Sequence, residues 1–182
     1  MTLEESIYHH SLIAPNKVAA VCKNESITYS ELWKSIISCA ETLKSENVLP
    51  NRPYVFRSSQ DINFVIKYCA IHYIGAIAVP LESNVNDENF NQIYNEVNSC
   101  EFAEDIVDIL YTTGTTGKSK GVMLSETALV SCADNFIADL GFTSDLLFII
   151  SGPLSHIASL FKMHPVLTVG GTICILDGLK DI

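Results

Sequence analysis

The chain has 182 residues, a formal net charge of −10 and a pI of about 4.8. Nucleic acids and anionic membranes require clustered positive charge, so this acidic balance argues against both as partners. The composition, 48% hydrophobic and 18% charged, is that of a globular protein. No apolar run approaches the ~18 residues that a membrane-spanning helix requires.

The first half of the chain alternates predicted helices with predicted strands. Thr28 and Glu31 have the spacing of a capping box and predict a helix start. Gly75 predicts a helix end. In chain order we expect a helix over 2–13, a strand over 17–23, a helix over 28–45, a strand over 53–58, a helix over 60–74 and a strand over 76–82.

The second half continues this alternation. Four apolar residues at helical spacing predict a helix: Phe90, Ile93, Tyr94 and Val97. Ser125 and Gly141 predict the two ends of a later helix. The other expected elements are strands over 106–111, 121–125, 146–151 and 171–177, and a helical segment around 156–167. This order predicts an α/β fold with a mostly parallel sheet flanked by helices, in a single domain over residues 1–182.

Metal sites and secretion are both disfavoured. Four acidic residues precede and enter one predicted strand: Glu101, Glu104, Asp105 and Asp108. We interpret them as a solvated connection rather than a metal site, because charge runs usually face solvent. The six cysteines include no CxxC pair and no Cys/His cluster typical of zinc. Together with an N-terminus that lacks the apolar core of a signal peptide, they predict a reducing, cytoplasmic location.

The segment YTTGTTGKSKG, Tyr111 to Gly121, combines hydroxyl groups, glycines and lysines directly after a predicted buried strand. Glycines let backbone amides approach a ligand closely, since no Cβ is in the way. Threonine hydroxyls and lysine ammonium groups can bind phosphate oxygens. The predicted phosphate-binding residues are Thr112, Thr113, Gly114, Thr115, Thr116, Gly117, Lys118 and Lys120.

A Walker P-loop, GxxxxGK[ST], is the nearest general pattern, but its context differs. Thr112 stands at the position of its first glycine. A P-loop opens directly into a helix whose free amide groups meet the phosphate. Here residues 121–124 favour a strand, and Ser125 is the first N-cap residue. The sequence predicts strand, loop, strand and then helix, which disfavours a P-loop nucleotide hydrolase.

The loop resembles that of the adenylate-forming superfamily, which includes acyl-CoA synthetases, aryl-CoA ligases, luciferases and peptide-synthetase adenylation domains. Members usually carry YTSGTTGxPKG, so Thr113 and Ser119 replace a serine and a proline. Four further stretches resemble family motifs, in the family's order: ITYSEL (27–32), HYIGAIAVPLES (72–83), GPLSH (152–156) and VGGTICIL (169–176).

The resemblance implies ATP- and Mg²⁺-dependent activation of a small carboxylic acid as an acyl-adenylate, followed by transfer to a thiol such as coenzyme A. It implies that the loop from Thr112 to Lys120 holds the β- and γ-phosphates, and that His156 lies in the substrate pocket. Ser155 and Ser159 replace the aromatic residue and the glycine that are common nearby. No motif supports a role for the other histidines: His9, His10, His72 and His164.

Several family elements would follow Ile182: a second sheet, a glutamate that helps to hold Mg²⁺, and a mobile C-terminal domain with a catalytic lysine. We therefore expect residues 1–182 to form an incomplete AMP-binding-type N-terminal domain that is inactive alone. The alternative is a non-catalytic truncated relative. Such a relative would act as a binding or homo-oligomerisation module through its uncovered surface.

Overall fold

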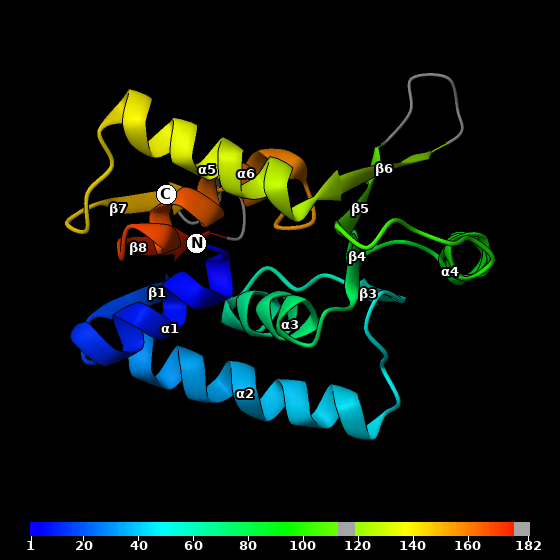
Figure 1. The fold of residues 1–182 in the computed structure, drawn as a ribbon, viewed down its shortest axis with the longest axis horizontal. Coiled ribbons are helices and arrows are strands. Elements are labelled where there is room, and N and C mark those ends of the chain that lie inside the picture. Colours follow the sequence, from blue (N-terminus) through cyan, green and yellow to red (C-terminus); the bar gives the residue numbers. More distant parts are fainter. Residues whose placement is uncertain (113–118, 177–182) are drawn as a thin grey trace.

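The computed structural model describes residues 1–112 and 119–176 (Figure 1). The helices are α1 (Leu3–Ile13), α2 (Tyr29–Ser45), α3 (Ile62–Tyr73), α4 (Asp87–Asn98), α5 (Glu126–Leu140) and α6 (Ile157–Thr168). The strands are β1 (Val18–Cys22), β2 (Glu25–Thr28), β3 (Pro53–Arg57), β4 (Ile77–Leu81), β5 (Ile106–Thr112), β6 (Lys120–Ser125), β7 (Leu147–Ile150) and β8 (Thr172–Ile175). Each predicted element is present, and β2 is an addition. No helix in the described part of the chain is both long and apolar enough to span a bilayer.

Local sequence determines where several helices begin and end. The Thr28 hydroxyl accepts the Glu31 amide N–H at 3.3 Å, and the Glu31 carboxylate accepts the Thr28 amide N–H at 2.9 Å. This pair is the predicted capping box. The Ser125 side chain caps α5. Gly75 and Gly141 follow α3 and α5 with φ values of 74° and 65°, a left-handed conformation that glycine adopts without strain.

The strands form two sheets rather than the single sheet expected. We call β2–β1–β8–β7 the first sheet and β3–β4–β5–β6 the second sheet. The pairings β1–β2 and β5–β6 are antiparallel, and the other four are parallel. Mostly parallel pairing is thus confirmed. The described residues already form two sheets, because β1 pairs with β2 and β8 instead of joining β3.

Two hydrophobic cores hold the layers together. The larger core takes side chains from both sheets and from α1, α2, α3 and α6. The smaller core lies between the second sheet and α4, where Ile77 and Val79 pack with Ile93 and Val97. Successive side chains of a strand face opposite sides, so β4 also contributes Ala78 to the larger core. Accordingly, α3 and α4 lie on opposite sides of β3–β6 (Figure 1).

Gln60, between β3 and α3, joins the carboxyl edges of the two sheets. Its amide nitrogen donates to the carbonyl oxygens of Gly152 and Leu176, at 2.9 and 3.0 Å. Its amide oxygen accepts the Leu154 N–H at 3.0 Å. Gly152 and Leu154 follow β7, and Leu176 follows β8. One side chain from the second sheet therefore holds the segment 151–156, which leads into α6.

Candidate functional site

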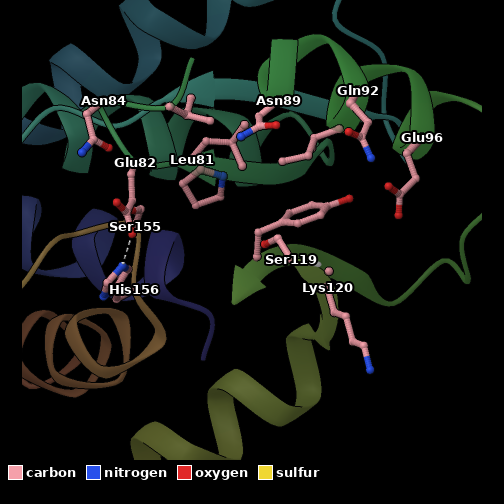
Figure 2. Close-up of a pocket in the computed structure, with 15 residues that line it drawn as sticks. Leu81, Glu82, Asn84, Asn89, Gln92, Glu96, Ser119, Lys120, Ser155 and His156 are labelled. Carbon is pink, nitrogen blue, oxygen red and sulfur yellow. Dashed lines mark hydrogen bonds and ion pairs between the residues drawn. The ribbon is translucent and has the colours of Figure 1, made fainter. Parts of the chain in front are cut away.

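A cavity of about 850 Å³, which we call the large cavity, lies at the carboxyl edge of the second sheet (Figure 2). Parallel α/β sheets bind ligands at this edge, where strands end and loops begin. Its volume falls within the range of about 300–1,000 Å³ usual for ligand pockets. The described residues that line it are Pro80, Leu81, Glu82, Asn84, Val85, Asn89, Gln92, Ile93, Glu96, Tyr111, Ser119, Lys120, Gly121, Ser155 and His156.

The predicted phosphate-binding loop begins and ends at this cavity. Thr112 is the last residue of β5, and Lys120 is the first residue of β6. Ser119 and Lys120 line the cavity, and the Ser119 hydroxyl donates to the Thr112 carbonyl oxygen at 2.6 Å. The other predicted loop residues lie outside the described residues: Thr113, Gly114, Thr115, Thr116, Gly117 and Lys118.

The elements around the loop have the predicted order. β6 runs antiparallel to β5, with Thr112 opposite Lys120, and α5 begins only after its N-cap Ser125. A Walker P-loop would open into a helix at its lysine and hydroxyl residue. The predicted order of the described elements, strand β5, strand β6 and then helix α5, is confirmed, and it differs from that of a P-loop nucleotide hydrolase.

His156 and a carboxylate that the motifs did not identify form a pair at one end of the large cavity. The His156 Nε2 lies 2.9 Å from Oε1 of Glu82, which accepts the hydrogen bond. Their side chains are 43% and 40% exposed. His156 is the N-cap residue of α6, and its imidazole makes no capping hydrogen bond, so it is free to contact Glu82. The feature that could have identified Glu82 as a site residue is its position directly after β4.

The opposite end of the large cavity carries Lys120 and Glu96 (Figure 2). Tyr111 lies near Glu96, and burial together with the Glu96 carboxylate raises the pKa of its hydroxyl to about 12. This phenol therefore stays protonated at neutral pH and can donate a hydrogen bond. Lys120 supplies positive charge beside the phosphate-loop flank, while Glu82 and His156 lie across the cavity. The cavity thus has one end that carries a lysine and a glutamate and one end that carries the Glu82–His156 pair.

A second histidine–carboxylate pair lies buried at β5, the strand that precedes the predicted phosphate-binding loop. Asp108 of β5 is 0% exposed, and its carboxylate accepts hydrogen bonds from the Tyr68 hydroxyl at 2.7 Å and from His72 Nε2 at 3.0 Å. His164 Nε2 lies 3.0 Å from the Tyr68 oxygen, and His72 Nδ1 lies 3.4 Å from Glu4 Oε1. We call these five residues the buried polar cluster. They come from α1, α3, β5 and α6.

The buried polar cluster corrects two interpretations. Asp108 is not part of a solvated connection, because it lies inside a strand whose neighbouring side chains are buried. His72 and His164, which no motif supported, are its partners. The usable signal was the position of Asp108 within the apolar run IVDILY, where a charge requires a partner. Glu101, Glu104 and Asp105 are exposed, as expected.

The cluster distributes its charge unevenly. Burial alone would lower the pKa of His72, but the Asp108 and Glu4 carboxylates raise it to about 10. Burial lowers the pKa of His164 to about 4, and the nearby positive charge of His72 adds to this effect. Burial would raise the pKa of Glu4, yet contact with His72 lowers it. At neutral pH His72 is therefore cationic and His164 is neutral.

Known proteins resemble the chain over nearly its whole length. The D-alanine–D-alanyl carrier protein ligase of Bacillus licheniformis is 23% identical over 95% of this chain and 42% of its own. The 2-succinylbenzoate–CoA ligase of Bacillus mycoides is 23% identical over 96% of this chain and 44% of its own. The chain thus spans less than half the length of these curated relatives.

Solved structures show the same fold. The o-succinylbenzoate CoA synthetase of Bacillus subtilis, solved with its acyl-adenylate intermediate, has a TM-score of 0.79 at 21% identity and covers 94% of this chain and 55% of its own. MatB from Rhodopseudomonas palustris has a TM-score of 0.81 at 19% identity, over 98% of this chain and 46% of its own.

The AMP-binding enzyme family matches residues 9–101 and 95–181, which together cover most of the sequence. The match includes the loop strand β5, the large cavity and His156. It agrees with the relatives, which carry ligase names, and with the fold of the solved structures. The chain belongs to the AMP-binding enzyme family and thus to the adenylate-forming superfamily.

Proposed function

We propose that the protein uses ATP to activate a carboxylic acid as an acyl-adenylate. A carboxylate oxygen attacks the α-phosphorus of ATP, and pyrophosphate leaves. A thiol then attacks the acyl carbon, AMP leaves, and a thioester forms. The observation that carries this proposal is the glycine- and threonine-rich loop after β5, whose flanking residues Ser119 and Lys120 line the large cavity. Ligase relatives from the same family support it.

The proposed roles follow the two ends of the large cavity. The loop from Thr112 to Lys120 would bind the β- and γ-phosphates, with Lys118 and Lys120 stabilising the charge that develops on leaving pyrophosphate. His156 would contact the acid at the other end, held by Glu82.

The family also implies Mg²⁺. Within the described residues no group of three or more His, Cys, Asp or Glu side chains could hold a metal ion. We place the metal ligands outside this chain and derive no step from them.

ATP–pyrophosphate exchange with a panel of fatty, aryl and amino acids tests this proposal on the full-length protein. The Lys118→Ala/Lys120→Ala variant should lose exchange and ATP-dependent thermal stabilisation while keeping its fold. Lys34→Ala, on the exposed face of α2, is the matched control and should retain both. Absence of exchange with every acid would contradict the proposal, as would full exchange in the double-lysine variant.

The acyl acceptor is the finer part of the proposal. We favour coenzyme A, because the GPLSH segment resembles that of acyl- and aryl-CoA ligases. The relatives include both a ligase for a carrier protein and a CoA ligase. Incubating the activated acid separately with coenzyme A and with a phosphopantetheine carrier protein distinguishes them, since only the true acceptor forms a thioester at the enzymatic rate.

A non-catalytic module remains the second candidate, because one sheet edge carries exposed apolar side chains. Leu147 and Ile149 of β7 are 60% and 54% exposed, and β7 is an edge strand of the first sheet. Such an edge can pair with another chain.

We propose that residues 1–182 are one incomplete N-terminal domain, in the cytoplasm, as its six free cysteines suggest. Intact mass from the native source and light scattering test these points. A native mass of 20.0 kDa would favour the truncated, non-catalytic relative, and a clean monomer would count against self-association.

A further inference from the structure

A second cavity, of about 350 Å³, adjoins the large one at the edges of both sheets. We call it the small cavity. It shares Glu82, Asn84 and Ser155 with the large cavity, so the two communicate there. Its described lining is polar apart from one proline, and Glu82 is its one charged residue. The lining residues are Ser58, Gln60, Glu82, Ser83, Asn84, Ser151, Pro153 and Ser155.

Hydrogen bonds to the backbone hold the wall of the small cavity in place. Gln60 uses its amide nitrogen and oxygen on backbone groups after β7 and β8. It therefore shapes the cavity rather than offering a binding group. On the opposite side, Ser58 follows β3, and its amide N–H donates to the Leu81 carbonyl oxygen at 2.8 Å. A site built on strand ends and backbone hydrogen bonds keeps its geometry better than one on a free loop.

Ser155 provides an independent sign of a ligand. The residue is only 4% exposed, and its Oγ has no hydrogen-bond partner among the described residues. Burying a hydroxyl group without a partner costs about 1–3 kcal/mol, so native structures rarely tolerate it. Ser155 lines both cavities. Its Oγ is closed to solvent, so a polar group of a bound molecule at their junction would satisfy this hydroxyl when the side chain turns toward the cavity.

Glu82 determines which kind of polar group fits. Its Oε1 accepts from His156, and the side chain is 40% exposed. A carboxylate can accept further hydrogen bonds at its other oxygen. The described lining of the small cavity contains no lysine or arginine that could pair with a second anion. The junction therefore favours a group that donates hydrogen bonds and disfavours another carboxylate.

We propose that the small cavity binds a hydrogen-bond-donating substituent, a hydroxyl or an amino group, carried by the acid that the protein activates. This inference rests on the proposed function. The substituent donates to the Glu82 carboxylate and pairs with the Ser155 hydroxyl, while the reacting carboxylate lies in the large cavity. An unsubstituted alkyl chain would strip water from these polar walls without replacing its hydrogen bonds, and sites of this kind reject such analogues strongly.

The test uses matched acids on the full-length protein: butanoic, 4-hydroxybutanoic and 4-aminobutanoic acid, and benzoic acid with its hydroxy and amino derivatives. ATP–pyrophosphate exchange reports activation, and calorimetry without ATP reports binding. We expect at least one substituted acid to exceed its parent by about tenfold or more in kcat/KM and in affinity. The hydroxy and amino arms identify the donor.

Two variants locate the effect. Ser155→Ala should lower affinity for the substituted acid and leave that for its parent unchanged. Glu82→Gln also frees His156, so it should lower affinity for both acids, and more for the substituted one. Because Ser155→Ala removes an unpaired buried hydroxyl, the melting temperature should stay the same or rise. Glu41→Gln and Ser38→Ala, on the surface of α2, are matched controls that should change nothing.

The outcomes separate the two proposals. Exchange with parent and substituted acids alike would overturn the inference and leave the proposed function standing. Binding of a substituted acid that depends on Glu82 and Ser155, without exchange, would support the inference and count against the function. If no substituted acid binds better than its parent, the inference is overturned whatever the exchange assay shows.

Discussion

The second sheet carries two histidine–carboxylate pairs on adjacent strands, and they differ chiefly in depth. The Glu82–His156 pair follows β4 at the sheet edge, with side chains 40% and 43% exposed. The Asp108–His72 pair belongs to the middle of β5, with side chains 0% and 7% exposed. The distances are nearly equal, 2.9 and 3.0 Å. The same chemical pair therefore stands in water in one place and in the core in the other.

Depth decides what each pair can do. Taking two charges out of water carries a large penalty, which only close contact and further hydrogen bonds offset. Asp108 has both in Tyr68 and His72. These two hydrogen bonds occupy its carboxylate oxygens, so Asp108 is not available to a ligand. The open pair has lost little hydration, contributes little to folding and can exchange water for a substrate. We assign the buried pair to stability and the open pair to binding.

Breaking the buried pair should have the largest effect on stability. Asp108→Asn leaves the His72 cation in the core without its carboxylate, at a cost of about 3–5 kcal/mol in the free energy of unfolding. Urea denaturation followed by circular dichroism measures this loss. In the Asp108→Asn/His72→Gln double variant the charge is gone as well, so the combined loss should fall short of the sum of the single losses. Additive losses would mean that the two side chains do not act as a pair.

The pH dependence of stability should show the opposite pKa shifts of the two cluster histidines. Protonated His72 stabilises the fold fully below its ordinary pKa of 6.5, and this contribution is lost as the pH rises through about 10. His164 stays neutral in the fold, so between its ordinary pKa of 6.5 and its folded pKa of about 4 the unfolded chain binds a proton that the folded chain does not. In this range the stability of the fold decreases as the pH decreases. The lowered pKa of Glu4 adds to this loss of stability in acid. Stability should therefore be greatest near neutral pH.

Urea midpoints measured from pH 4 to pH 10 check this profile. His72→Gln should flatten its alkaline side and His164→Gln its acid side. A profile with the same slopes in all variants would refute the assignment of the two histidines.

Removing a single hydroxyl from the cluster should have a smaller effect. Tyr68→Phe keeps the packed ring but withdraws the hydrogen bonds to Asp108 and His164, at a cost of about 1–3 kcal/mol. Thermal and urea unfolding measure it. Tyr94→Phe, on the exposed side of α4, is a control for the loss of a tyrosine hydroxyl and should be neutral. Equal stability of both variants would place Tyr68 outside the network.

The open pair should give the smallest effect. Glu82→Gln is expected to change the free energy of unfolding by no more than about 1 kcal/mol, because a pair of exposed polar side chains gains little over its hydrated partners. The measurement is the same urea titration as for Asp108→Asn. A loss comparable with that of the buried variant would overturn the contrast between the two pairs and give Glu82 a structural role.

Local patterns predicted the elements, and long-range packing explains what they missed. Thr28, Ser125 and Gly141 mark helix ends by chemistry within a few residues, so the sequence reveals them. The split into two sheets depends on β1 pairing with β8, and no local pattern contains that pairing. His156, which the motif singled out, lines the large cavity.

The partners of the predicted residues were harder to find than the residues themselves. Glu82 and His156 are 74 positions apart, and Asp108 meets His72 and Tyr68 from another element. Each contact exists only because strand ends or helix faces meet in the fold. Asp108 nevertheless gave a warning, since a lone carboxylate within IVDILY contradicts the apolar pattern of its strand.

The order of strands along the chain has a consequence for synthesis. The second sheet is built from consecutive strands, so all of its strands have been made once Ser125 has been added to the growing chain. The first sheet is discontinuous: the β1–β2 hairpin emerges first and acquires its neighbour β8 last. Until then the hairpin lacks β8 and α1 lacks α6, although both can already pack on α2 and α3. Apolar surfaces left exposed in this way attract chaperones or other nascent chains. The N-terminal residues, although translated first, are therefore among the last to reach their native environment on the ribosome.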